Sequence, residues 1–206
     1  MGHGRFRAYM TSCDARREVC ALSAAALAAT DWGEPPIIVW DEAPFDRIQT
    51  RIEHTGRRLL QRAVDETEDL FLFLEDDVEF NQSLRHNLED WPPIAERRAG
   101  DYLFASLYNP NIVRPRSPGD QSAVVVADPR CFYGTQAVVL SVATARSILD
   151  CWDELRAPTD IRMSRLAARR SPILFHRPSL VQHRPVLSTW GGGEHEAIDF
   201  SPDWRA

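Results

Sequence analysis

The sequence predicts an α/β fold in which helices flank a mixed, mostly parallel central sheet. Stretches with strand character alternate along the chain with stretches whose apolar residues recur at helical spacing. Residues 70–74, Leu-Phe-Leu-Phe-Leu, are continuously apolar, which is typical of a strand covered on both faces. The length of 206 residues, of which 44% are hydrophobic, suits one domain with a full core.

Each element follows from its own local pattern. Short apolar runs predict strands over 5–10, 36–40, 70–74, 102–107 and 132–140, and an extended segment broken by Pro178 over 174–183. Helical spacing predicts helices from Asp14 through Leu27, over 48–64, from an Asn81 cap through Trp91, over 143–155 and over 160–170. Residues 109–128 hold three prolines, and we expect them to form a long irregular loop.

The basic residues restrict the chemistry, because all 24 of them are arginine and the sequence contains no lysine. This excludes Schiff-base and pyridoxal-phosphate enzymes, P-loop proteins and protein kinases, which all depend on a lysine. Any phosphate must therefore be held by arginine, backbone N–H groups or a metal. The net charge of −6 combines −8 over residues 1–110, +5 over 111–185 and −3 over 186–206. The basic stretch indicates either an anion-binding face or a solvated arginine surface.

The cysteines and the N-terminus indicate a cytoplasmic protein. The four cysteines show neither a CxxC pair nor zinc-finger spacing, so we expect reduced thiols. The first residues lack the apolar core of a signal peptide. No apolar run approaches the roughly 20 residues of a membrane span, so we expect no integral membrane association.

The strongest chemical signal is Glu75-Asp76-Asp77, directly after the apolar strand. Ligands of open α/β sheets bind just beyond the carboxyl ends of the strands. Three adjacent carboxylates repel one another unless a cation or basic groups neutralise them, and Mg²⁺ and Mn²⁺ prefer oxygen ligands. The motif therefore predicts a divalent metal site, with a merely solvated acidic turn as the alternative.

Residues 71–77, Phe-Leu-Phe-Leu-Glu-Asp-Asp, resemble the acidic DXD-type motif of GT-A fold glycosyltransferases. They are closest to the lipooligosaccharide-type and N-acetylglucosaminyltransferase-IV-like families, in which an apolar strand ends in Glu-Asp-Asp. The resemblance extends over almost the whole chain. It implies a single GT-A-like domain over 1–206, in which residues 1–110 bind the nucleotide sugar and 111–206 bind the acceptor and close the site.

The resemblance also implies site residues. Thr11, Ser12 and Arg16 resemble the first nucleotide-contacting loop, Asp41 the nucleoside contact after the second strand, and Gly134 the segment bordering the donor sugar. Asp77 and His183 resemble the metal ligands, with Glu75 as a third candidate, while Asp76 would face ribose or sugar hydroxyls. Asp160 resembles the catalytic base of inverting members, and Ser188 belongs to a stretch that resembles their closing segment.

Six further residues are candidates from their residue type and position. Arg57 and Arg58 could grip the nucleotide or simply be solvated. Arg165 and Arg169, together with Arg170, have the spacing of one helix face, which could bind an anionic acceptor or be plain surface. Trp190 precedes three glycines, as suits either a segment that closes over substrate or an ordinary surface turn.

The implied function is metal-dependent, inverting transfer of a sugar from a nucleoside-diphosphate sugar, with UDP as the expected nucleotide, to a hydroxyl acceptor. One imidazole beside carboxylates favours Mn²⁺ over Mg²⁺. A nucleotidyltransferase acting on a sugar phosphate is an alternative, although residues 11–17 lack the glycine and lysine usual in its loop. A non-catalytic nucleotide- or carbohydrate-binding module is another. The acceptor stays open among a glycan, a small molecule, a protein and a hydroxylated nucleic-acid base, as does the oligomeric state.

Overall fold

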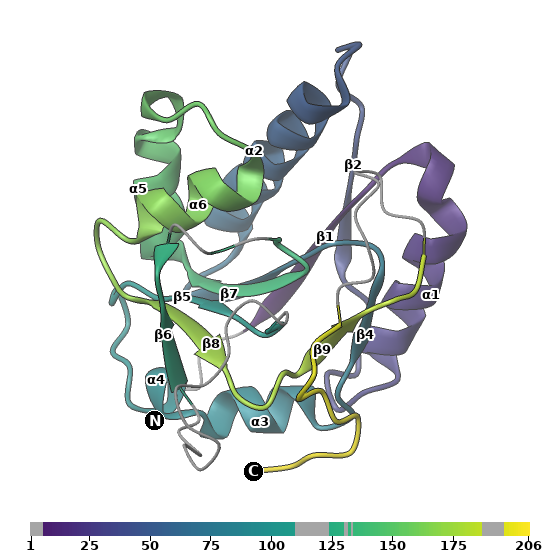
Figure 1. Ribbon diagram of the computed structural model, residues 1–206, viewed down its shortest axis with the longest axis vertical. Helices are drawn as coiled ribbons and strands as arrows, with labels where there is room; N and C mark the ends of the chain where they lie inside the picture. Colours follow the sequence, from purple (N-terminus) through teal and green to yellow (C-terminus); the bar gives the residue numbers. More distant parts are fainter. Residues whose placement is uncertain (1–5, 110–123, 130–131, 133, 187–195) are drawn as a thin grey trace.

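The computed structural model describes residues 6–109, 124–129, 132, 134–186 and 196–206 (Figure 1). The strands within these residues are β1 (Arg7–Ser12), β2 (Ile37–Trp40), β3 (Leu70–Leu74), β4 (Val78–Phe80), β5 (Phe104–Ser106), β6 (Val124–Ala127), β7 (Ala137–Ser141), β8 (Ile173–His176) and β9 (Val181–His183). The helices are α1 (Arg17–Ala28), α2 (Ile48–Glu66), α3 (Leu84–Asp90), α4 (Pro92–Ala95), α5 (Val142–Asp150) and α6 (Thr159–Ala167), with single 3₁₀ turns at Asp14–Arg16 and Trp152–Glu154.

The main sheet of the described chain confirms the predicted fold class. Its strand order is β2-β1-β3-β7-β5-β8-β6. Strands β1, β2, β3, β5 and β8 run in one direction, and β7 and β6 run in the other. The sheet is therefore mixed but mostly parallel, and helices lie on both of its faces (Figure 1).

Strand β3 sits at the centre of this arrangement because its side chains supply both cores. Leu70, Leu72 and Leu74 pack into the core under α1, α3 and the small sheet of β4 and β9. Phe71 and Phe73 point to the opposite face, where they join the core under α2, α5 and α6. All five side chains are buried, which confirms the prediction of a strand covered on both faces.

Several boundaries differ from the sequence prediction. Strand β1 begins and ends two residues later than expected, so Thr11 and Ser12 belong to the strand rather than to a turn. The strand expected over 132–140 begins only at Ala137. The last two long helices end at Asp150 and Ala167, earlier than expected. Helix ends are poorly specified by apolar spacing, because the final turn contributes few buried side chains.

Strands β4 and β6 were missed altogether. Residues 124–127 lie in the stretch expected to be a loop, but they form β6, which pairs antiparallel with β8. Its Val-Val-Val run has strong β propensity, which outweighs the prolines that precede it. The extended segment over 174–183 is in fact two strands, because β8 joins the main sheet whereas β9 pairs with β4 in a separate sheet. Three-residue strands such as β4 and β9 are too short to show a period.

None of the described helices combines the length and apolar character needed to cross a membrane. The described cysteines, Cys13, Cys20 and Cys151, are free thiols, and only Cys20 is fully buried.

The fully buried Asn81 joins the end of the chain to the start of α3. Its Nδ2 donates to the carbonyl oxygens of Ser201 and Trp204, each at 2.8 Å. Its Oδ1 accepts from the Ser83 N–H at 2.9 Å and from Asn87 Nδ2 at 2.8 Å. Ser83, not Asn81, is the N-cap residue of α3, so the expected cap position was wrong by two residues.

Replacing Asn81 by alanine is expected to leave buried carbonyl and amide groups unpaired. We expect Asn81→Ala to lower the free energy of unfolding by about 2–3 kcal/mol in urea denaturation. Gln49→Ala, which removes an exposed amide bonded only to Glu53, serves as the control and should change it by less than about 0.5 kcal/mol. Equal losses in the two variants would contradict this role of Asn81.

Candidate functional site

The carboxyl ends of β1, β2 and β3 meet at one edge of the sheet, because the three strands are parallel and in close register. Ser12 lies opposite Trp40, and Met10 lies opposite Leu74. The edge therefore brings the end of β1, the residue after β2 and the acidic run after β3 together. We call these strand ends, together with the residues that bond to them, the carboxyl edge.

Asp76 is bound to the end of β1. Its side chain accepts from Ser12 Oγ at 2.5 Å and from Arg16 Nε at 2.8 Å, and only 5% of the residue is exposed. Burial raises the pKa of Asp76, while the Ser12 hydrogen bond and the Arg16 charge oppose that rise. The structure thus brings together three residues expected at the nucleotide-sugar site.

Asp77 shares one carboxylate oxygen between two basic side chains. Arg16 Nη2 donates to Oδ2 at 2.6 Å, and His183 Nε2 lies 3.2 Å from the same atom. The other oxygen, Oδ1, is buried and has no hydrogen-bond partner among the described residues. Burial raises the pKa of Asp77, but the His183 hydrogen bond and the charges of His183 and Arg16 outweigh it and lower the pKa overall. The same hydrogen bond raises the pKa of His183.

The small sheet explains how His183 reaches Asp77 across the sequence. Strand β4 follows directly after Asp77 and pairs antiparallel with β9, which places His183 opposite Val78. The next N–H, of Arg184, donates to the carbonyl oxygen of Asp77 at 2.7 Å. The Arg184 side chain continues this link through Val78 O at 3.1 Å and Glu79 at 3.0 Å. The contact between Asp77 and His183 is therefore fixed by backbone pairing on both sides.

Glu75 turns towards the segment before β7. Its Oε1 accepts from Thr135 Oγ1 at 2.7 Å and from the Thr135 N–H at 3.1 Å. Burial and the neighbouring charges of Asp77 and Asp160 raise the pKa of Glu75 to about 7, although both Thr135 bonds lower it. Its expected role as a third metal ligand stays a prediction.

Asp160 is held by the residue before Thr135. Its Oδ2 accepts from the Gly134 N–H at 2.8 Å, and its Oδ1 accepts from the Ile161 N–H at 2.8 Å. Gly134 has φ +85°, a left-handed conformation that favours glycine. Two successive N–H groups thus hold the carboxylates of Asp160 and Glu75.

The remaining nucleotide-site candidates divide into two groups. Asp41 and Thr11 belong to the carboxyl edge: the Asp41 N–H donates to Ser12 O at 2.7 Å, and Thr11 Oγ1 donates to Leu74 O at 3.4 Å. The Asp41 carboxylate pairs with Arg51 at 2.8 Å, a partner that the sequence analysis missed. Arg57 is exposed and lies 3.5 Å from Asp153.

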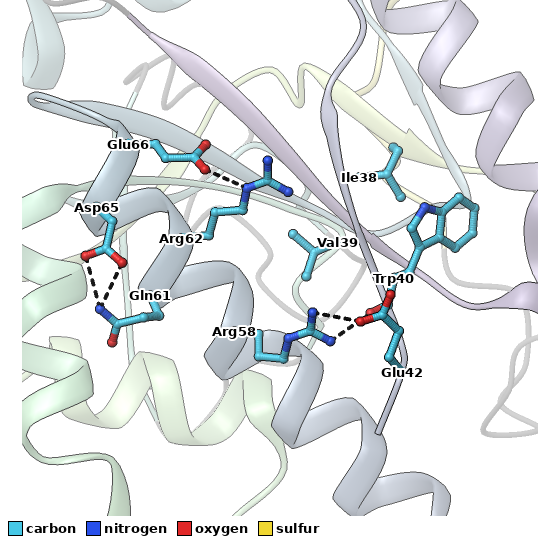
Figure 2. A pocket seen from close by; sticks show the side chains of 9 residues that line it. All are labelled: Ile38, Val39, Trp40, Glu42, Arg58, Gln61, Arg62, Asp65 and Glu66. Carbon is cyan, nitrogen blue, oxygen red and sulfur yellow. Dashed lines mark hydrogen bonds and ion pairs between the residues drawn. The ribbon is translucent and has the colours of Figure 1, made fainter. Parts of the chain in front are cut away.

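Arg58 lies at the carboxyl end of β2. It donates to Trp40 O at 3.2 Å and to Glu42 at 3.1 Å, and it lines a cavity of about 450 Å³ between β2 and α2 (Figure 2). The side chains around this cavity pair mostly with one another, as Arg62 does with Glu66 at 2.9 Å (Figure 2). This cavity includes none of the acidic residues after β3.

The shared helix face expected for Arg165, Arg169 and Arg170 does not form, whereas their role at the acceptor stays a prediction. Helix α6 ends at Ala167, so Arg169 and Arg170 lie beyond it and do not continue the face that carries the exposed Arg165. Arg169 pairs with Glu154 at 2.6 Å, and Arg170 lies over the Tyr102 ring at 5.9 Å. The other candidates for closing the site, Ser188 and Trp190, lie outside the described residues.

Asp77 and His183 fit a divalent cation as a pair of protein ligands. The described residues contain no group of three His, Cys, Asp or Glu side chains placed to hold a metal. Two protein donors nevertheless suit Mg²⁺ or Mn²⁺, which commonly complete their coordination with waters and substrate phosphates. The unpartnered, buried Asp77 Oδ1 supports this fit, because an orphaned carboxylate oxygen costs free energy unless a cation or donor satisfies it.

No protein-family model matches the sequence, and no curated protein matches it. Among solved structures, the fold is similar to a glycosyltransferase involved in the glycosylation of the major capsid of PBCV-1, with 13% identity, a TM-score of 0.48 and coverage of 84% of this chain and 82% of that one. It is also similar to the galactosyltransferase LgtC in complex with donor and acceptor sugar analogues, with 11% identity, a TM-score of 0.48 and 87% coverage of both chains.

The raised pKa of Glu75 predicts a specific pH dependence of stability. Between its ordinary value and about 7, the folded protein retains a proton that the unfolded chain releases, so rising pH destabilises the fold. The side chain of Glu75→Gln cannot ionise. As the pH rises from about 5 to about 8, we therefore expect the free energy of unfolding, measured by urea denaturation, to fall less for Glu75→Gln than for the wild type.

The exposed Glu68 provides the matched control for this measurement. Glu68→Gln, which makes the same substitution at an exposed position, should follow the wild-type curve. Parallel curves for Glu75→Gln and the wild type would contradict the assignment of a buried, protonated Glu75.

Proposed function

We propose that the protein is a glycosyltransferase that moves a sugar from a nucleoside-diphosphate sugar, UDP being the expected nucleotide, to a hydroxyl acceptor. Residues 1–110 would supply most donor contacts, and residues 111–206 would supply the base and the acceptor side. The order of motifs along the sequence supports this proposal. The observation that carries it is the convergence of Asp77 and His183, with an unpartnered carboxylate oxygen, beside Ser12 and Arg16.

Asp77 and His183 would hold the divalent cation, with Mn²⁺ favoured over Mg²⁺ by the imidazole ligand. When bound, such a cation neutralises the negative charge that develops on the leaving diphosphate. The chain itself contributes the guanidinium of Arg16, which already bonds Asp76, and the hydroxyl of Ser12. With no lysine in the sequence, a diphosphate at this edge would be held by arginine, backbone N–H groups and the cation.

Asp160 would act as the general base. An ionised carboxylate offers about four lone-pair sites, so its two N–H bonds leave room for a hydroxyl. The acceptor oxygen would attack the anomeric carbon as its proton passes to Asp160, and the bond from that carbon to the diphosphate oxygen would break. In-line attack inverts the anomeric centre. The Gly134 N–H fixes the carboxylate in place for this step.

The first test is Asp77→Asn, which retains the shape of the side chain but removes its charge. We expect turnover of a panel of UDP-sugars with Mn²⁺ to fall about 100-fold or more, measured as UDP release. Asp65→Asn changes an exposed carboxylate bonded to Gln61 and should leave turnover unchanged. Unaltered turnover in Asp77→Asn would remove Asp77 from the site, and release of pyrophosphate in place of UDP would identify a nucleotidyltransferase.

The second test separates the base from the donor site. We expect Asp160→Asn to slow sugar transfer about 100-fold or more while UDP affinity stays at the wild-type level, because the base acts only on the acceptor proton. The control is Asp153→Asn, an exposed neighbour that pairs with Arg57. Transfer rates of the variants and the wild type would be compared at saturating donor and acceptor, and their UDP affinities would be compared by calorimetry. Wild-type transfer by Asp160→Asn would contradict the assignment.

A further inference from the structure

Arg16 bonds the two aspartates that follow β3. It ends the turn that follows β1, where its N–H donates to Cys13 O at 2.9 Å. From there one guanidinium reaches both acidic neighbours, with Nε 2.8 Å from Asp76 Oδ1 and Nη2 2.6 Å from Asp77 Oδ2. The Arg16 side chain is 19% exposed, so these ion pairs are only partly screened by water.

The two contacts of Arg16 are not equivalent. Asp76 has a second, neutral donor in Ser12. Asp77 instead shares its Oδ2 between Arg16 and His183, and within the described part of the chain its Oδ1 has no hydrogen-bond partner. A divalent cation at Asp77 and His183 must therefore compete with a positive charge already bound to the same carboxylate. Arg16 can release Asp77 and still remain bonded to Asp76 through Nε, so the release does not leave the guanidinium without an anionic partner.

We propose that Arg16 is an intramolecular counter-ion that keeps Asp77 closed to divalent cations until a nucleoside diphosphate draws its guanidinium away. This inference rests on the proposed function, because it takes the diphosphate to bind at the carboxyl edge. A diphosphate is a strong acceptor for the forked N–H groups of arginine. Its binding would free Asp77, so nucleotide and cation would each raise the affinity for the other, by the same factor.

The test measures cation affinity in the absence of nucleotide. We expect Arg16→Gln to bind Mn²⁺ about tenfold more tightly than the wild type, measured from the loss of the free Mn²⁺ signal in electron paramagnetic resonance. Arg17→Gln is the matched control, because it removes the same charge one residue away, where Arg17 pairs with the exposed Asp14 and lies over Trp40. It should bind Mn²⁺ like the wild type, and Asp77→Asn should not bind it.

A second variant covers the case in which Arg16→Gln fails to fold. A single ammonium group cannot span two carboxylates as the guanidinium fork does, so Arg16→Lys should also bind Mn²⁺ more tightly than the wild type. In metal-free buffer, both variants should bind UDP more weakly than the wild type in calorimetry. Mn²⁺ affinity in folded Arg16 variants no higher than in Arg17→Gln would overturn the proposal.

The outcomes separate this inference from the function on which it rests. Tighter Mn²⁺ binding by Arg16→Gln, with weaker binding of UDP and no sugar turnover by the wild type, would support the counter-ion and contradict the glycosyltransferase. Mn²⁺-dependent turnover by the wild type, with unchanged Mn²⁺ affinity in Arg16→Gln, would contradict the counter-ion alone.

Discussion

Compensation of three consecutive carboxylates at the end of a fully buried strand is the constraint on which this edge of the sheet depends. Each carboxylate is compensated differently. Asp76 takes a hydroxyl from β1 and the guanidinium of Arg16, and Asp77 takes the other end of that guanidinium together with His183. Glu75 accepts two hydrogen bonds from Thr135, and its pKa is raised. The partners of these carboxylates come from the turn after β1, from β9 and from the segment before β7. The same bonds therefore hold these elements together and hold the site in place.

The exclusive use of arginine has a structural consequence at this point. A guanidinium can donate from Nε and Nη2 in one plane, which allows Arg16 to bond Asp76 and Asp77 at once. A lysine ammonium would concentrate its charge on one of them. Arg16 therefore compensates two carboxylates at once, while Asp77 Oδ1 is buried without a hydrogen-bond partner among the described residues. An incompletely compensated site of this kind can respond to an incoming anion and cation together.

The sequence alone predicted the parts of the site that follow from local pattern. A continuous apolar run followed by acids placed Glu75, Asp76 and Asp77 at a strand end. Ser12 and Asp41 were expected from the family resemblance, and the parallel strands bring them to the same edge. The pairing of β4 with β9 could not be predicted, because three-residue strands have no measurable period and are about a hundred residues apart in the chain. Thr135 and Arg51 were missed because their roles depend on which way a loop or helix face is turned. The arginine face of α6 failed because spacing does not show where a helix ends.

The most direct measurement is the anomalous scattering of a crystal grown with MnCl₂ and UDP. We expect a manganese peak bonded to a carboxylate oxygen of Asp77 and to His183 Nε2, with the UDP phosphates completing its coordination and Arg16 turned from Asp77 towards them. UDP bound at the carboxyl edge with no manganese at Asp77 would contradict the proposed metal site. UDP and manganese bound elsewhere on the protein would contradict the assignment of the carboxyl edge as the donor site.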